Sequence, residues 1–111
     1  MRCMILIYSS AISEVAIQVD AHEAFRAAHN ELIHELSASG ELVDTNELST
    51  DGAKIVRTGN DVSITDGPYA ETTEWVSGYY LIDVADEARA LQIAARFVEA
   101  RYVIVEVRRL G

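Results

Sequence analysis

The sequence contains little cysteine and little positive charge, and each shortage excludes a class of protein. Its one cysteine, Cys3, cannot form a disulfide within the chain, and no cysteine–histidine cluster has the spacing of a zinc site. The formal net charge of −9 argues against binding to nucleic-acid phosphates and to anionic membrane surfaces. No apolar stretch reaches membrane-spanning length, and no signal segment is recognisable. We therefore expect a cytoplasmic protein without a metal site.

The length and composition predict one folded domain. A chain of 111 residues has room for one hydrophobic core, which it can build without disulfides or metals. Half of its residues are apolar and 24% are charged, as in globular rather than disordered proteins. Because no repeat, linker or low-complexity segment divides the chain, residues 1–111 are treated as a single domain.

Two predicted strands, residues 2–10 and 76–84, carry apolar side chains on both faces. In the first strand the alternation places Cys3, Ile5 and Ile7 opposite Met4, Leu6 and Tyr8. In the second strand it places Tyr79 and Leu81 opposite Tyr80, Ile82 and Val84. Strands of this kind are buried on both sides, which is unusual in so small a protein.

Two helices are expected. The first is predicted to start at the N-cap Asp20, with Glu23 completing a capping box, and to end at Gly40. Its apolar stripe is Phe25, Ala28, Leu32, Ile33 and Leu36. Residues 11–19 are expected to form a loop with a short turn. The second helix is capped by Asp86, with a predicted buried stripe at Ala88, Leu91, Ala94, Ala95 and Val98.

The remaining strands are shorter or more polar. Residues 41–48 are predicted to form an edge strand or the end of a strand, because most of their side chains are polar. Residues 54–58 and 61–65 flank Gly59-Asn60, which predicts a hairpin with a two-residue loop. Residues 102–108 close the sheet, with Val103, Val105 and Val107 facing the core.

The order of elements predicts an α+β fold of the ferredoxin-like kind: a split β-α-β antiparallel sheet with two helices on one face and an inserted β-hairpin. In this plan the first strand and the strand at 76–84 are central. Two helices cannot cover both faces of the sheet, so an apolar face would be left open. We therefore expect a homodimer packed sheet face to sheet face, with about 800 Å² buried per subunit.

The segment from Asp66 to Tyr80 holds the only proline and the only tryptophan of the chain. Asp66-Gly67-Pro68 has the chemistry of a tight turn, because Asp bonds nearby backbone amides and Pro fixes its own φ. The turn has two possible roles. It can simply pin the hairpin, or Asp66, Glu71 and Thr72 can line a pocket on a loop held by the sheet.

The stretch Asp66-Gly67-Pro68-Tyr69-Ala70-Glu71-Thr72 resembles the signature of the DGPF domain family, a branch of the YCII-related proteins. The family pattern is Asp-Gly-Pro-Phe-Ala-Glu-Thr-Lys-Glu, so Tyr69 replaces Phe and Thr73 replaces Lys. The resemblance spans the whole chain and implies a dimeric ferredoxin-like fold. Proteins of this family are often described as lying near, or fused to, sigma factors of the extracytoplasmic-function type, which implies a regulatory association.

His29 is the leading candidate for a functional side chain. It lies on the apolar stripe of the first helix, where a histidine is commonly a packed residue with satisfied nitrogens. Arg26-Ala27-Ala28-His29 is similar, however, to the Arg-x-x-His pattern on the first helix of YCII-related proteins. In those proteins the histidine has been proposed as part of an active site.

The first functional hypothesis is a small-molecule enzyme with lyase- or isomerase-like proton transfer. His29 would move the proton, and Asp66 would orient it or act as the partner base. Arg26 would hold an anionic substrate, with Tyr69, Glu71 and Thr72 completing its binding site. No cofactor is implied, because the chain lacks a phosphate-binding glycine loop, a dinucleotide fingerprint and a nucleophile elbow.

Two alternatives stay open. The chain can be a non-catalytic module that binds a metabolite or a protein through the acidic loop, Tyr69, Trp75 and Tyr79. It can also carry no functional site in this region, with His29 hydrogen-bonded to a backbone carbonyl and the Asp66 turn serving only to pin the hairpin.

Overall fold

The computed structural model describes residues 1–68 and 73–111. The elements in chain order are β1 (Arg2–Ser10), α1 (Ala11–Asp20), α2 (His22–Ser39), β2 (Leu42–Glu47), β3 (Lys54–Arg57), β4 (Ser63–Asp66), β5 (Glu74–Asp83), α3 (Glu87–Ala94), the 3₁₀ turn η1 (Val98–Arg101) and β6 (Val105–Arg109). Among the described residues, no helix is long and apolar enough to cross a membrane.

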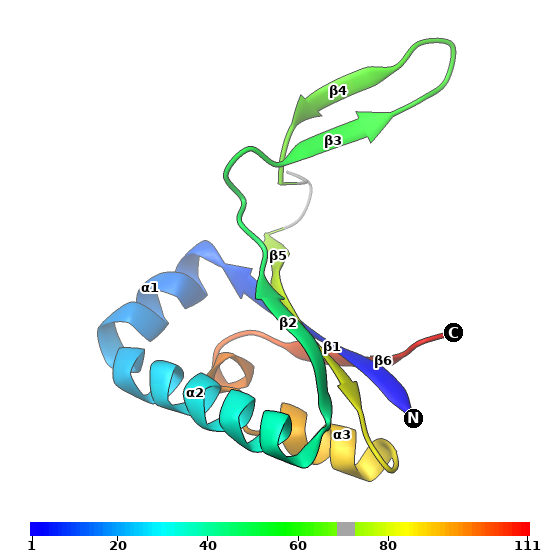
Figure 1. Cartoon of the computed structure of the whole chain (residues 1–111). Coiled ribbons are helices and arrows are strands. Elements are labelled where there is room, and N and C mark those ends of the chain that lie inside the picture. Colours follow the sequence, from blue (N-terminus) through cyan, green and yellow to red (C-terminus); the bar gives the residue numbers. More distant parts are fainter. Residues whose placement is uncertain (69–72) are drawn as a thin grey trace.

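Four strands form one antiparallel sheet in the order β2-β5-β1-β6. The two strands predicted to be central, β1 and β5, are central, and the polar strand β2 lies at an edge as predicted. Helices α2 and α3 lie on the same face of this sheet (Figure 1). The α+β class and the antiparallel sheet are thus confirmed, and the arrangement is consistent with a ferredoxin-like fold.

The core lies between the sheet and the two helices. Leu32 and Leu36, one turn apart in the C-terminal half of α2, are buried against Ile5 and Ile82 of the central strands. The predicted stripe of the second helix was only partly right: Ala94 and Val98 are buried, but Ala88, Leu91 and Ala95 are exposed, and Ala90, Ile93 and Phe97 are buried instead. Within α3 the buried face is thus the one that carries Ala90, Ile93 and Ala94, and Phe97 and Val98 enter the core from the segment that follows the helix's end at Ala94.

The expectation of a loop at residues 11–19 was also wrong, because this segment is helix α1. Ser10 caps it in a reciprocal box: the Ser13 amide donates to Ser10 Oγ (3.0 Å), and the Ser10 amide donates to Ser13 Oγ (2.8 Å). Asp20 is therefore the last residue of α1 rather than the cap of the next helix, and α2 follows Ala21 without a side-chain cap. The end of α2 at Gly40, which has φ +80°, is as predicted.

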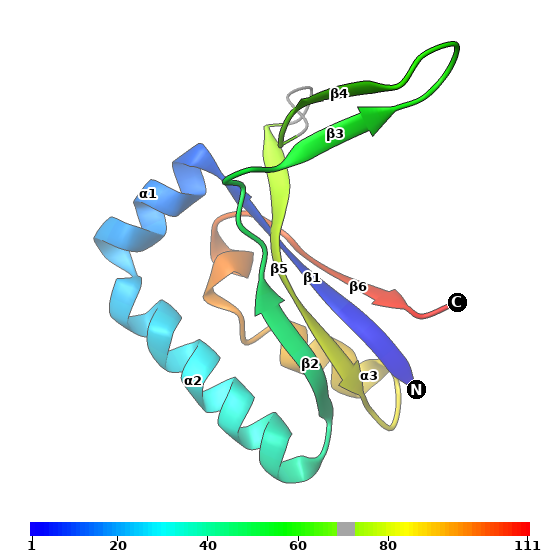
Figure 2. The same ribbon diagram turned by 45° about the horizontal axis from the view of Figure 1, so that its top comes forward.

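The inserted hairpin stands apart from the main sheet. Strands β3 and β4 pair only with each other in a two-stranded sheet, and Arg57 opposite Ser63 closes a five-residue loop rather than the predicted two-residue one. The hairpin projects beyond the end of the four-stranded sheet (Figures 1 and 2). Its base is held by the Gly67 amide, which donates to the Ala53 carbonyl (2.7 Å), and by an ion pair between Lys54 and Asp66.

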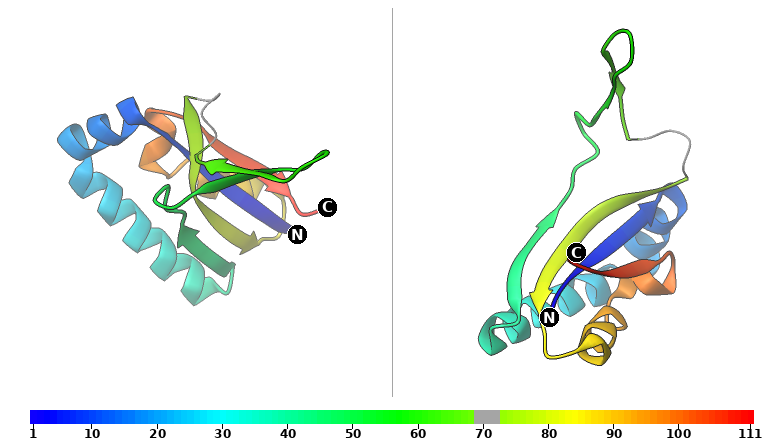
Figure 3. Two further views of the ribbon diagram at one scale, coloured as in Figure 1. Left: turned by 90° about the horizontal axis from the view of Figure 1, so that it is seen from above. Right: turned by 90° about the vertical axis from the view of Figure 1, so that its right-hand side faces the viewer.

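The sheet face opposite the helices carries the second apolar set. Leu6 lies opposite Tyr79 and Met4 opposite Leu81 in the β1–β5 ladder, and these four side chains are only partly buried. No helix of the described part of the chain covers this face (Figure 3). We call it the bare sheet face; it consists of Met4, Leu6, Tyr8, Val76, Tyr79 and Leu81 with the charged residues Asp44, Glu106 and Arg108 at its edges.

Candidate functional site

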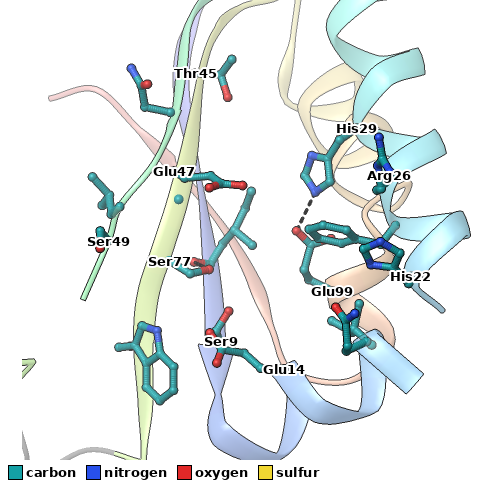
Figure 4. Close-up of a pocket in the computed structure, with 18 of the residues that line it drawn as sticks. Ser9, Glu14, His22, Arg26, His29, Thr45, Glu47, Ser49, Ser77 and Glu99 are labelled. Atoms are coloured by element: carbon teal, nitrogen blue, oxygen red, sulfur yellow. Dashed lines mark hydrogen bonds and ion pairs between the residues drawn. The ribbon is translucent and has the colours of Figure 1, made fainter. Parts of the chain in front are cut away.

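A cleft of about 1260 Å³ opens between the helices and one end of the sheet. Its walls are α1 and the N-terminal half of α2 on one side, and β1, β2 and β5 on the other (Figure 4). The cleft exists because the fully buried residues of α2, Leu32 and Leu36, lie in its C-terminal half. The N-terminal half of α2 therefore stands off the sheet, and its side chains face a hollow rather than a packed core.

Three side chains from three elements form a hydrogen-bonded chain at this cleft. The Nδ1 atom of His29 (α2) lies 2.7 Å from the hydroxyl of Tyr80 (β5), and its Nε2 atom lies 2.7 Å from Oε2 of Glu99 (η1). The side chain of His29 is 19% exposed, whereas that of Glu99 is 6% exposed and Tyr80 is 2% exposed. All three line the cleft, and His29 is the most exposed of them.

The donors and acceptors of this set follow from their chemistry. An ionised carboxylate only accepts, so the bond to Glu99 requires a proton on Nε2 of His29. In the neutral imidazole Nδ1 then accepts, and the Tyr80 hydroxyl donates to it. Burial, together with the nearby Glu99 carboxylate, raises the pKa of Tyr80 to about 12, so this hydroxyl keeps its proton at neutral pH.

The imidazole ring is also held by aromatic packing. Phe25 and Phe97 meet it edge-on, with ring centroids 4.8 Å and 5.3 Å from that of His29. Phe97 is itself packed edge-on against Tyr80, at 4.9 Å. Edge-to-face contacts of this kind fix the plane of a ring as well as bury it. The ring of His29 is therefore oriented before any ligand enters the cleft.

Glu99 keeps one acceptor unused. Its Oε1 atom is buried and has no hydrogen-bond partner within the described ranges, although Oε2 is bonded to His29. A buried carboxylate oxygen without a donor costs on the order of 1–3 kcal/mol, so such an atom calls for an explanation in a native structure. Here it can accept a hydrogen bond from a donor group that reaches the floor of the cleft.

Charged side chains of both signs line the rest of the cleft. His22, Arg26 and His29 are spaced four and three residues apart, so they lie along one side of α2, and all three face the hollow. Glu14 from α1 and Glu47 from β2 lie on the other walls (Figure 4). Arg26 forms no ion pair with any residue in the described ranges. The cleft thus offers a free cation and free carboxylates to a polar ligand.

The family model of the YCII-related domain matches residues 1–110. The chain belongs to the YCII-related domain family. No curated protein matches the sequence. The match covers nearly the whole chain, so the cleft, its hydrogen-bonded residues and the hairpin all lie inside the YCII-related domain.

The predicted site residues lie in different regions of this YCII-related domain. His29 and Arg26 both line the cleft, as the sequence suggested they could. Asp66 ends β4, its side chain is 86% exposed, and within a single chain it is not among the residues that line the cleft. Its role as partner of His29 stays a prediction. Tyr69, Glu71 and Thr72 lie outside the described residues.

Sequence reasoning missed Tyr80 and Glu99 as partners of His29 in this YCII-related domain. Tyr80 was placed in a strand with apolar side chains on both faces, which already implied a buried hydroxyl in need of a partner. Glu99 follows the apolar pair Phe97-Val98 directly, and a carboxylate in such a setting is rarely buried without one. Both signals were present, but neither indicates which residue provides the partner.

Proposed function

We propose that the cleft binds a small molecule and that His29 transfers a proton to and from it, with Glu99 as its carboxylate partner. The observation that carries the proposal is the buried hydrogen-bonded chain from Tyr80 through His29 to Glu99, set in the wall of a large cleft. A histidine oriented by a carboxylate on one nitrogen is equipped to accept a proton on the other. In this proposal Glu99 takes the orienting role that the sequence assigned to Asp66.

The proton reaches Nδ1 of His29 through the Tyr80 hydroxyl, which is donor and acceptor at once. The substrate gives a proton to the Tyr80 oxygen while Tyr80 passes its own proton to Nδ1. The resulting imidazolium is stabilised by the carboxylate of Glu99 at 2.7 Å. The proton then returns along the same path. Delivery to another atom of the substrate completes an isomerisation, and delivery to a leaving group completes an elimination; neither needs a further reactant.

The substrate class follows from the remaining lining residues. Arg26 supplies a fixed positive charge on the wall of α2, so one end of the substrate is anionic. Apolar lining residues such as Val15, Ile17 and Phe25 contact its body. The unused Oε1 atom of Glu99 favours a hydroxyl or amine beside the reacting carbon.

A thermal-shift screen of small organic acids tests the binding step. The wild-type chain is compared with His29→Ala and with His34→Ala, which removes a histidine from the same helix that does not line the cleft. We expect at least one compound to stabilise the wild type and the His34 variant but not the His29 variant. Equal stabilisation of all three proteins would show that the compound binds elsewhere.

A second candidate, a non-catalytic binding module, is favoured by one observation. Both ring nitrogens of His29 already have protein partners, so the residue can serve to hold the cleft wall rather than to react. Deuterium exchange separates the two functions. With a stabilising compound in D₂O, proton transfer replaces a carbon-bound hydrogen by deuterium, which NMR detects as loss of a proton signal. Binding without chemistry leaves that signal unchanged in the presence of the wild-type chain.

We further infer that the chain belongs to the DGPF branch of the family and pairs with a second copy through the bare sheet face. The motif Asp66-Gly67-Pro68 and the residues after it support the branch. The pairing is supported by surface area: the chain exposes 7278 Å², about 1,200 Å² more than a compact monomer of 12.2 kDa. Its radius of gyration is 15.7 Å, against about 13 Å for a compact chain of this length.

The polar groups of the bare sheet face are suited to burial in such a pair. The Tyr8 hydroxyl donates to Oε1 of Glu106 (3.1 Å), and the Tyr79 hydroxyl donates to Oδ2 of Asp44 (2.6 Å). Two carboxylates at the edges of the face are therefore already bonded within the chain, which lowers the cost of covering them. Static light scattering at micromolar concentration tests the pairing, and a stable monomer would contradict it.

A further inference from the structure

Helix α1 exposes apolar side chains that a helix of a monomeric protein would be expected to bury. Ile12, Val15 and Val19 are 83%, 64% and 75% exposed, and their spacing of three and four residues places them on one outward stripe. The side chain that α1 does bury is small and polar, Ser13. Val15 and Val19 also line the cleft, but all three side chains stay mostly exposed, so the stripe is open to a partner outside the chain. A hollow of about 520 Å³ along it is lined by α1 alone.

The β3–β4 hairpin carries a second unpartnered apolar surface. Val56 and Ile64 lie directly opposite each other in the ladder and are 61% and 64% exposed, and Val62 in the adjoining loop is 66% exposed. None of the residues in the two strands is buried. A two-stranded hairpin in water is marginally stable by itself, so an ordered one needs a surface to pack against.

We propose that the hairpin is an arm that docks, through Val56 and Ile64, on the α1 stripe of a second copy of this chain. The proposal rests on the pairing of bare sheet faces inferred above and adds a second contact to it. The occupant is another copy because both surfaces belong to this chain and both are exposed in it, so a two-fold pair satisfies them reciprocally.

The arrangement of the elements allows this contact. The hairpin leaves the sheet at the end where β1 runs into α1, and it leans toward the side away from the helices (Figures 1 and 3). A second copy that presents its bare face lies on that side. In a two-fold pair whose axis runs along the strands, the hairpin ends of the two sheets lie together, so the arm of each copy extends over the end of the partner's sheet where the partner's α1 begins.

The contact bears on the cleft because α1 has two roles. The stripe of Ile12, Val15 and Val19 is the docking surface, and Val15 and Val19 also line the cleft, as do Glu14, Ile17 and Gln18 of the same helix. An arm docked on α1 holds this wall in place from outside. Ligand binding in one subunit is therefore coupled to the hairpin of the other, and a ligand that orders α1 strengthens the pair.

Disulfide trapping between two singly substituted chains tests the proposal. Val56→Cys and Ile12→Cys are each made in a Cys3→Ala background, and one chain carries a mass tag. The two are unfolded together, refolded and oxidised. We expect a disulfide-linked pair that contains one chain of each kind. The matched control replaces Ile12→Cys by Leu91→Cys on α3, a site that is also exposed (52%) but lies outside the proposed contact, and it should give no such pair.

Light scattering on the same samples separates this proposal from the pairing of sheet faces. Dimers in which Val56→Cys links to position 12 no more than to position 91 would overturn the arm and leave the pairing intact. A monomer at every concentration would overturn both. As an independent measure, Val56→Ser with Ile64→Ser should raise the dimer dissociation constant about tenfold or more, and Ile12→Ser with Val19→Ser should do the same. No change in either double variant would contradict the contact.

Discussion

The two carboxylates compared as partners of His29, Glu99 and Asp66, lie in contrasting environments. Glu99 is 5% exposed, bonded to the imidazole at 2.7 Å and set between core residues. Asp66 has an 86% exposed side chain at the base of a projecting hairpin, where it pairs with Lys54. The turn motif led to the prediction that Asp66 is the partner of His29, whereas in the structure the carboxylate bonded to His29 is that of Glu99. A distinctive motif such as Asp66-Gly67-Pro68 thus indicates that the backbone must turn there. Which carboxylate lies next to the imidazole of His29 is decided by the packing of the whole fold.

The largest expected effect comes from removing the buried carboxylate. Glu99→Ala leaves the Nε2 proton of His29 unpaired inside the protein, which should lower the free energy of unfolding by about 2–4 kcal/mol. Urea denaturation measures the loss. Glu99→Gln keeps an acceptor for Nε2 and should cost less than Glu99→Ala, but it removes the charge that stabilises an imidazolium. If Glu99→Ala unfolds at the wild-type urea concentration, the buried hydrogen bond does not support the fold.

Arg26 is expected to contribute to ligand binding but not to stability. Its side chain is exposed and forms no ion pair with a described residue, so Arg26→Gln should leave stability within about 0.5 kcal/mol of wild type. The same change should weaken binding of an anionic ligand about tenfold, because a charge-assisted hydrogen bond is lost. Arg101→Gln, an exposed arginine outside the cleft, is the matched control. Calorimetric titration with a compound from the screen distinguishes the two variants.

Tyr80 gives a smaller effect with a distinct pH dependence. Tyr80→Phe removes the donor to Nδ1 and should cost about 1 kcal/mol. Because burial and the Glu99 charge raise the pKa of Tyr80 from 10.0 to about 12 in the folded chain, the unfolded chain loses this proton first as pH rises. The stability that Tyr80 contributes is therefore complete below pH 10 and lost as pH rises toward 12. Urea melts across this range should show the fall in wild type and a shallower fall in Tyr80→Phe.

Local patterns predicted the sheet well because each strand is specified by its own residues. The alternation in β1 and β5 identified the two central strands, and Gly40 marked the end of α2. Helix α1 was missed for a physical reason. Its apolar residues, at positions 11, 12, 15, 16, 17 and 19, are spread around the helix and interrupted by polar ones, so no single stripe stands out, and its cap is the less obvious Ser10–Ser13 pair.

The site was only partly predictable because its members are distant in sequence. His29 and Arg26 were found from a short pattern on one helix, and both line the cleft. Tyr80 and Glu99 join His29 from a strand and a 3₁₀ turn that lie 51 and 70 residues further along the chain. Strand alternation puts Tyr80 on the same face as Ile82 and Val84, but no pattern within one element indicates which buried group it meets.

The smallest expected effect is the one that decides whether Asp66 has any function at the cleft. Asp66→Asn removes an exposed ion pair with Lys54, which is worth little in water, so stability should change by no more than about 0.5 kcal/mol. Within one chain Asp66 does not line the cleft, so ligand affinity should also stay at the wild-type value. A loss of affinity in Asp66→Asn at unchanged stability would mean that the hairpin of a second copy brings its aspartate to the partner's cleft. The carboxylate predicted from the turn motif would then act between subunits, beside the buried Glu99 that acts within one.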